Sequence, residues 1–152
     1  MEPPSTGRST FEDFRPGVTF VERLLDTLAA ERGLDRGRMV LVGFSQGAAL
    51  AFAVAREDRL RPRGIVALAG VLPDGDVGRL RGIPIFWGHG TQDTHVPIEA
   101  ARADVERLRR VGASVQMCEA DVEHRVGVEC MRGLKQWWLA HFSDEELRVV
   151  KG

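Results

Sequence analysis

Residues 39–56 have the sequence MVLVGFSQGAALAFAVAR. The run at 39–43 (MVLVG) is apolar without polar alternation, which is typical of a strand covered on both faces of a parallel sheet. The alanine-rich segment 46–56 favours a helix. Between the two lies the sequence GFSQG, from Gly43 to Gly47, so a G-x-S-x-G pattern stands in the strand-to-helix context that it requires.

The pattern around Ser45 predicts the sharp turn that a nucleophilic serine needs. A sharp turn from strand to helix lifts the hydroxyl above the strand end, strains the backbone, and favours glycine at both Gly43 and Gly47. It also places Ser45 at a helix N-terminus, where the N–H of Gln46 can donate to an oxyanion. We therefore predict Ser45 as nucleophile and Gln46 as oxyanion donor; the alternative is a plain strand-to-helix turn.

Strands and helices alternate along the rest of the chain. Further strands are predicted at 64–69 (GIVALA), 84–87 (PIFW) and 114–118, and helices from Pro16 and Gly17 to Gly33, over 97–111 and over 126–142. This alternation predicts the α/β class, with a mostly parallel sheet and helices on both faces. We expect one domain over 1–152, with an irregular lead-in at 1–15, a core at 16–142 and a tail at 143–152, where Ser143 and Glu146 form a capping box.

An acid and a base follow two of the predicted strands. Asp93 comes shortly after the strand at 84–87, and His124 comes after the strand at 114–118 and before the last helix. In an open α/β sheet, functional groups collect at the carboxyl ends of strands, where Ser45 also lies. We predict that His124 takes the proton of Ser45 and that Asp93 fixes the imidazole tautomer. The alternatives are a turn carboxylate and a surface histidine.

A metal site is a weaker hypothesis for the same region. His89, Asp93 and His95 are close in sequence, but two histidines and one aspartate without a further cluster make a thin ligand set. We expect His89 to form hydrogen bonds within its loop, and we predict no metal at this site.

Composition and charge exclude several classes of protein. The chain has 152 residues, 43% of them hydrophobic and 28% charged, which is typical of one soluble domain. A net charge of −1 provides no long-range attraction to nucleic acid or to an anionic membrane. No apolar run approaches the roughly 20 residues of a membrane span, so we expect no stable membrane insertion.

The N-terminus and the cysteines indicate in which cellular compartment we expect the protein. The first twenty residues are polar and broken by prolines, so they lack the apolar core of a signal peptide. Cys118 and Cys130 are not expected to form a disulfide framework, and this expectation fits a reducing cytoplasm. The excess of arginine over lysine is most simply explained by a GC-rich bacterial genome.

Three segments together resemble the phospholipase/carboxylesterase family of small bacterial serine esterases, which belongs to the α/β-hydrolase superfamily and is related to acyl-protein thioesterases. The segments are GFSQGAALA (43–51), HGTQDTHVP (89–97) and EHRVGVE (123–129). The resemblance implies Ser45, Asp93 and His124 as the catalytic triad. It also implies an acyl pocket lined by Gly70, Val71, Leu72 and Val96. The implied substrates are small carboxylic esters of short to medium acyl length, or in some members lysophospholipids or thioesters, hydrolysed without a cofactor.

The sequence departs from this pattern before the nucleophile. In the superfamily several strands precede the nucleophile, and an early loop supplies a second oxyanion donor. Here few residues precede Ser45 and no H-G-G loop is found, so we expect an N-terminally truncated fold with the strand at 39–43 at an unpaired apolar edge. Three hypotheses stay open: a fragment of an active esterase, an inactive remnant with a binding role, or a hydrolase that completes its sheet as a homo-oligomer.

Overall fold

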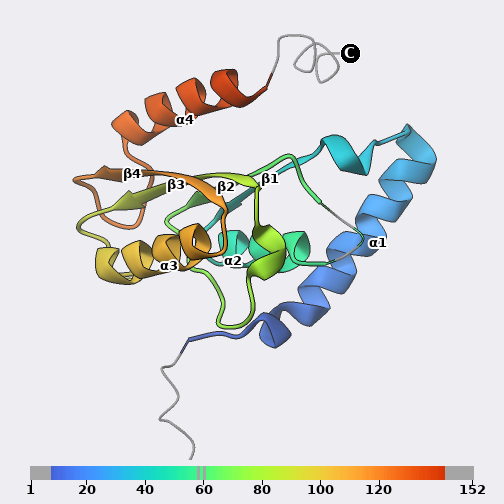
Figure 1. Ribbon diagram of the computed structural model, residues 1–152, viewed down its shortest axis with the longest axis horizontal. Helices are drawn as coiled ribbons and strands as arrows, with labels where there is room; N and C mark the ends of the chain where they lie inside the picture. Colours follow the sequence, from blue (N-terminus) through green and yellow to red (C-terminus); the bar gives the residue numbers. More distant parts are fainter. Residues whose placement is uncertain (1–7, 58, 60, 143–152) are drawn as a thin grey trace, which may run out of the picture.

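The computed structural model describes residues 8–57, 59 and 61–142 (Figure 1). The predicted capping box at Ser143 and Glu146 lies outside these residues. The helices are α1 (Arg15–Arg32), α2 (Gln46–Ala55), α3 (Ile98–Arg110) and α4 (Val128–His141). The strands are β1 (Val40–Phe44), β2 (Gly64–Leu68), β3 (Pro84–Gly90) and β4 (Ser114–Ala120). Short 3-10 turns are η1 (Phe11–Phe14), η2 (Arg36–Arg38) and η3 (Gly78–Leu80).

The four strands form one parallel sheet in the order β1-β2-β3-β4. Its register pairs Val42 with Val66, Val66 with Phe86 and Phe86 with Gln116. Helices α2 and α3 lie against one face of the sheet and α4 lies against the other (Figure 1). The predicted α/β class, with a parallel sheet and helices on both faces, is confirmed.

β3 and β4 are longer than the sequence predicts. Both were expected to end at apolar residues, Trp87 and Cys118, yet they continue to Gly90 and Ala120. The added residues remain paired, with Gly90 opposite Ala120. A polar residue such as His89 interrupts the apolar run without ending the ladder, because strand pairing depends on the backbone.

The main core fills the space between the sheet and helices α1, α2 and α3. Phe52 and Trp87 stack there with ring centroids 5.6 Å apart. A smaller cluster lies beneath α4 and contains Val66, Phe86 and Trp137. The lead-in, expected to be irregular, contains η1, and Phe11 from that turn is buried in the main core.

Within the part of the chain that the structure describes, β1 is the edge strand, and its C-terminal half is exposed on the α4 side. It pairs with β2, and the side chains of Val42 and Phe44 are 61% and 46% exposed. Among the described residues β1 pairs on one side only, in line with the expected apolar edge, whereas the expectation that this strand is covered on both faces is wrong. The reason is the position of α4, which packs mainly on β3 and β4; the cluster beneath it contacts Val40, whereas Val42 and Phe44 stay exposed.

The two cysteines form a disulfide, contrary to expectation. Cys118 of β4 and Cys130 of α4 are bonded, with their Cα atoms 5.6 Å apart. The sequence places them on separate elements, and α4 brings them together because it turns back over β4. Among the described residues, no helix combines the length and apolarity that crossing a membrane requires.

Candidate active site

Ser45 occupies a strained turn between β1 and α2. Its φ of 56° and ψ of −118° lie in a region that side-chain-bearing residues rarely adopt. The turn is held from both sides, since the N–H of Ser45 donates to Leu68 at 2.9 Å and its carbonyl accepts from Ala48 at 3.1 Å. The strain therefore persists because the surrounding hydrogen bonds fix it, and it presents the hydroxyl at the carboxyl edge of the sheet.

The two glycines that flank the turn are not equivalent. A Cβ atom on Gly43 would lie 2.2 Å from the carbonyl oxygen of Gly47, so a side chain at position 43 collides with backbone. A Cβ atom on Gly47 would meet nothing within 4 Å. The expectation that both positions favour glycine therefore applies to Gly43 and is wrong for Gly47.

His124 bridges Ser45 and Asp93. Its Nε2 lies 3.0 Å from the Oγ of Ser45, and its Nδ1 lies 2.7 Å from an Oδ of Asp93. An ionised carboxylate accepts hydrogen bonds and cannot donate them, so Nδ1 carries the proton and Nε2 is free to accept the serine hydroxyl. The structure thus brings the three predicted triad residues together in one hydrogen-bonded chain.

The carboxylate of Asp93 is buried, and both of its oxygens accept hydrogen bonds. One oxygen accepts the backbone N–H groups of His95 and Val96, both at 2.8 Å, and the other accepts His124. Burial acts to raise the pKa of Asp93, but the hydrogen bonds from Val96, His124 and His95 outweigh it and hold the pKa below its ordinary value. Asp93 is therefore a stable anion beside the imidazole.

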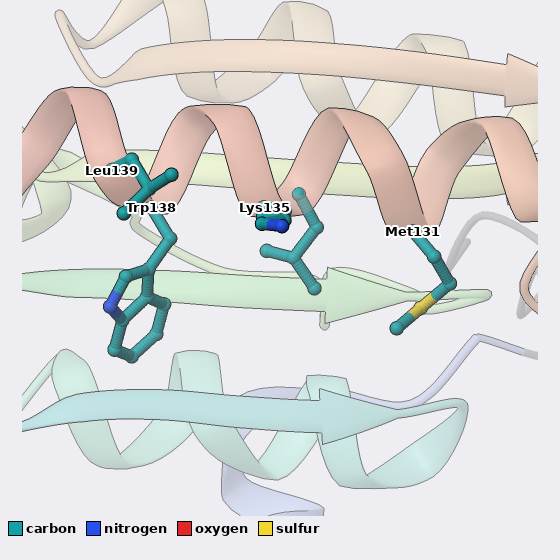
Figure 2. A pocket seen from close by; sticks show the side chains of 5 residues that line it. Met131, Lys135, Trp138 and Leu139 are labelled. Atoms are coloured by element: carbon teal, nitrogen blue, oxygen red, sulfur yellow. The ribbon is translucent and has the colours of Figure 1, made fainter.

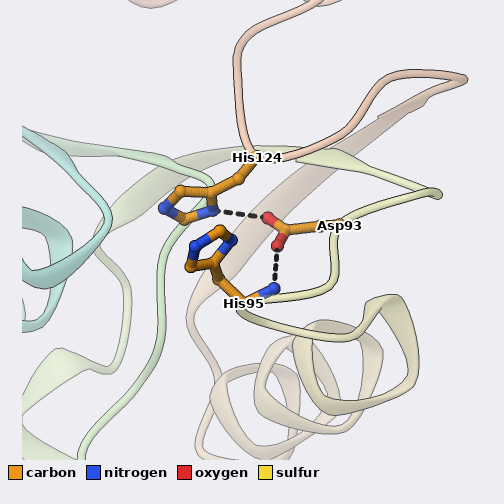
Figure 3. Close-up of side chains that lie close together, drawn as sticks. All are labelled: Asp93, His95 and His124. Carbon is orange, nitrogen blue, oxygen red and sulfur yellow. Dashed lines mark hydrogen bonds and ion pairs between the residues drawn. The ribbon is translucent and has the colours of Figure 1, made fainter.

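The ring of His95 stacks on His124, with centroids 4.7 Å apart, and Figure 3 shows both rings beside Asp93. The three side chains could in principle ligate a metal, because their ligand atoms lie within 4.8 Å of one another. Yet the oxygens of Asp93 already have three N–H donors, and a metal would have to displace His124 from one of them. This arrangement fits a hydrogen-bonded carboxylate better than a metal centre.

His89 supports the acid loop from β3. Trp87 donates its indole N–H to Nδ1 of His89 at 3.1 Å, so Nε2 carries the proton and donates to the carbonyl of Val96 at 2.8 Å. Because Val96 in turn donates to Asp93, this chain of bonds fixes the loop. The sequence indicated a hydrogen-bonding role for His89 but neither partner.

Gly90 allows the acid and base loops to approach each other. A Cβ atom on Gly90 would lie 2.2 Å from the carbonyl oxygens of Val122 and Glu123. Thr91 and Gln92 donate to the carbonyls of Ala120 and Val122, which ties the loop of Asp93 to the loop of His124. Sequence reasoning missed Gly90; its position at the end of a predicted strand, before the acid, was the available signal.

The four residues expected to line an acyl pocket do not share one environment in the structure. Gly70 lies under the nucleophile turn, where a Cβ would be 2.5 Å from the Cβ of Ala48, and Val71 is half-buried. Leu72 is fully buried in the main core and donates its N–H to Asp104, which makes it a packing residue. Val96 contributes the backbone bonds described above.

Gln46 is the first residue of α2. A backbone N–H at this position has no acceptor within its own helix and points out of the helix end. It is therefore free to donate to a negatively charged oxygen near Ser45.

A parallel sheet with a strained serine at the end of β1, an acid after β3 and a histidine after β4 defines the α/β-hydrolase fold. The family model described as Phospholipase/Carboxylesterase matches residues 7–141. The chain belongs to this family.

Curated relatives carry names of hydrolases. Acyl-protein thioesterase 1 of Saccharomyces cerevisiae is 33% identical over 101 residues, which cover 62% of this chain and 44% of that protein. A probable carboxylesterase of Oryza sativa subsp. japonica is 28% identical over 145 residues, covering 90% of this chain and 61% of that one. The chain thus spans about half the length of these relatives.

Solved structures share the fold at lower identity. The carboxylesterase of Bacillus cereus has a TM-score of 0.78 and 21% identity, with 93% of this chain and 68% of that chain covered. Acyl-protein thioesterase 2 of Zea mays has a TM-score of 0.72 and 20% identity, with 93% and 70% covered. About a third of each neighbour has no counterpart in the alignment.

Proposed function

We propose that this chain is a serine carboxylesterase that hydrolyses small carboxylic esters through an acyl-enzyme. The observation that carries the proposal is the hydrogen-bonded chain from the Oγ of Ser45 through His124 to Asp93. The family and the names of the relatives support ester or thioester hydrolysis as the reaction class.

In the proposed acylation step, the Oγ of Ser45 attacks the carbonyl carbon while its proton moves to Nε2 of His124. The new C–O bond converts the carbonyl into a tetrahedral oxyanion, which the N–H of Gln46 stabilises. When this intermediate collapses, the ester C–O bond breaks and the leaving alcohol takes the proton from His124. Asp93, held as an anion, stabilises the transient imidazolium.

In deacylation a water molecule replaces the alcohol. His124 takes a proton from that water, and the resulting hydroxide attacks the acyl carbon on Ser45. Collapse of the second tetrahedral intermediate breaks the bond to Oγ and returns the proton to Ser45. The free carboxylic acid leaves, and the proton balance closes without any cofactor.

For the acyl group we propose short to medium chains bound beside Gly70, Val71 and Val96. Gly70 and Val96 adjoin Ala48 of the nucleophile helix and Asp93, respectively. The packing of Leu72 in the core excludes its side chain from this proposal. Thioesters and lysophospholipids are further candidates by resemblance to the family.

A second candidate function is that of a weak or inactive hydrolase with a binding role. It is favoured by the oxyanion site, where Gln46 is the donor we can assign within the described part of the chain. Loss of one oxyanion donor costs about 3 kcal/mol, or a factor of 10²–10³ in rate. A chain with a single donor would therefore turn over slowly.

A panel of p-nitrophenyl esters from acetate to decanoate, hydrolysed by the wild-type chain and by Ser45→Ala, tests the proposal. We expect highest turnover with acetate or butyrate and none above background in the variant, whose circular dichroism should match the wild type. Undiminished turnover in Ser45→Ala would contradict the nucleophile assignment. Ester binding without turnover in the wild type would favour the binding role.

A further inference from the structure

His95 lies in the loop that carries Asp93, yet the reaction described above gives its side chain no role. Its backbone N–H donates to one carboxylate oxygen of Asp93 at 2.8 Å, and Val96 donates to the same oxygen at 2.8 Å. The chain therefore turns tightly around the carboxylate that accepts these bonds. The turn brings the side chain of His95 against the ring of His124, as Figure 3 shows.

The rings of His95 and His124 are stacked. Their centroids are 4.7 Å apart, and their planes are inclined by 27°. Stacking at this separation is favourable for aromatic pairs. The ring of Phe44 also contacts His124, with centroids 5.1 Å apart and an angle of 50°. His124 is thus in contact with one ring from the end of β1 and with one ring from the loop of Asp93.

The hydrogen bonds of His124 leave one motion of its ring open. They join Nδ1 to Asp93 at 2.7 Å and Nε2 to Ser45 at 3.0 Å. Imidazole nitrogens donate and accept in the plane of the ring, so these two bonds still allow the ring to tilt about the line between the nitrogens. A contact on the face of the ring opposes this tilt. Since a misplacement of about 1 Å can lower a catalytic rate about 100-fold, such a contact affects turnover without touching the substrate.

The same contact favours the charged form of His124. His124 becomes an imidazolium when it takes the proton of Ser45, and an aromatic face within about 6 Å attracts a cation. The ring of His95 lies within this range. Both effects require the face of an aromatic ring, and neither requires a particular nitrogen of His95.

We propose that His95 is a positioning residue for His124 and that it acts through the face of its ring. The inference rests on the proposed role of His124 as the general base. In the competing interpretation, His95 acts through a ring nitrogen, as a proton carrier or as a metal ligand. The two interpretations predict opposite results when the ring is kept without its nitrogens.

Steady-state kinetics with p-nitrophenyl acetate on His95→Ala, His95→Gln and His95→Phe tests the proposal. We expect kcat to fall about three- to tenfold in the alanine and glutamine variants, with KM within about twofold of the wild type, because the lost contact acts on the reacting imidazole. Phenylalanine should restore kcat to within about twofold. An unchanged kcat in His95→Ala, an equal loss in His95→Phe, or a change confined to KM would overturn the proposal.

His141→Ala is the matched control, because His141 is also an exposed histidine whose ring contacts an aromatic ring, that of Trp137 at 4.9 Å. Trp137 lies against Gly64 at the amino end of β2, whereas the triad lies at the carboxyl ends of the strands. The groove of about 250 Å³ that Figure 2 shows is lined by residues of α4 alone, so no triad residue reaches it either. We expect His141→Ala to keep the wild-type kcat, and a loss equal to that of His95→Ala would contradict a specific role of His95.

The mobility of the His124 ring separates this inference from the proposed esterase function. ¹³C relaxation of the Cε1–H group of His124 measures how far the ring moves, whether or not the chain hydrolyses an ester, and His124→Gln assigns the signal by its loss. We expect wild-type mobility in His95→Phe and greater mobility in His95→Ala and His95→Gln. Wild-type mobility in His95→Ala would overturn the positioning role even in an active esterase. The expected pattern in a chain without turnover would contradict the esterase proposal alone.

Discussion

At Gly43 the backbone of β1 passes so close to the first turn of α2 that the position excludes a side chain, whereas Gly47 faces open space. We predict that Gly43→Ala lowers the free energy of unfolding by about 2 kcal/mol or more, as overpacking against backbone does. Gly47→Ala should change it by less than about 1 kcal/mol, because it adds a methyl group without a clash. Urea denaturation of both variants measures the difference, and equal destabilisation would contradict the packing of the turn.

Asp93 is expected to control the tautomer of His124. In Asp93→Asn the amide can donate to Nδ1, so the proton moves to Nε2 and His124 can no longer accept the hydroxyl of Ser45. We predict a loss of kcat of about 10⁴-fold with little change in KM. Steady-state kinetics on a p-nitrophenyl ester measures this; a variant within tenfold of the wild type would show that Asp93 is not the orienting acid.

The lowered pKa of Asp93 also makes stability depend on pH. Because the folded-state pKa lies below its ordinary value of about 3.9, ionised Asp93 stabilises the fold above that pH, and the contribution is lost as pH falls through the lowered pKa. We predict that the wild-type urea midpoint exceeds that of Asp93→Asn at about pH 6 and that the gap narrows toward about pH 2. A gap that stays constant over this range would contradict the assignment.

Single residues differ in how far sequence could predict them. Ser45, Asp93 and His124 could be located because each follows a predicted strand, and parallel strands end at one edge. The hydrogen bonds of His89 to Trp87 and Val96 could not be predicted, because they depend on side-chain directions at strand ends.

At the scale of elements, the disulfide closes the segment that carries His124. It joins β4 to the first turn of α4 across a separation of 12 residues, and His124 lies between the two cysteines. In the chain-entropy model, a disulfide that closes a loop of about this length stabilises the fold by roughly 3 kcal/mol. We predict that dithiothreitol lowers the melting temperature of the wild-type chain, measured by circular dichroism.

The matched control is a double variant, Cys118→Ser with Cys130→Ser. It should melt near the temperature of the reduced wild type and should not respond to dithiothreitol. If the wild type melts at the same temperature with and without the reductant, the disulfide does not stabilise this segment.

The order and type of the elements could be predicted from apolar periodicity and glycine or proline boundaries. Which strands are covered by helices on both faces could not be predicted in this way. The run at 39–43 has the composition of a buried central strand, but β1 lies at the edge of the sheet that the described residues form, because strand neighbours are decided by long-range pairing.

At the scale of the whole molecule, alternation of strands and helices was sufficient to predict a parallel α/β sheet, and the resemblance to the family was sufficient to predict its class. Two features required the three-dimensional arrangement. The exposure of Val42 and Phe44 follows from α4 lying mainly over β3 and β4, and the disulfide follows from α4 crossing back over β4.

The central claim is that Ser45 is an activated nucleophile, and labelling with a fluorophosphonate followed by peptide mass spectrometry tests it most directly. We predict one covalent adduct, on the peptide that contains Ser45, with labelling abolished in Ser45→Ala and strongly slowed in His124→Ala. An adduct on another residue, or equal labelling of the wild type and Ser45→Ala, would contradict the account.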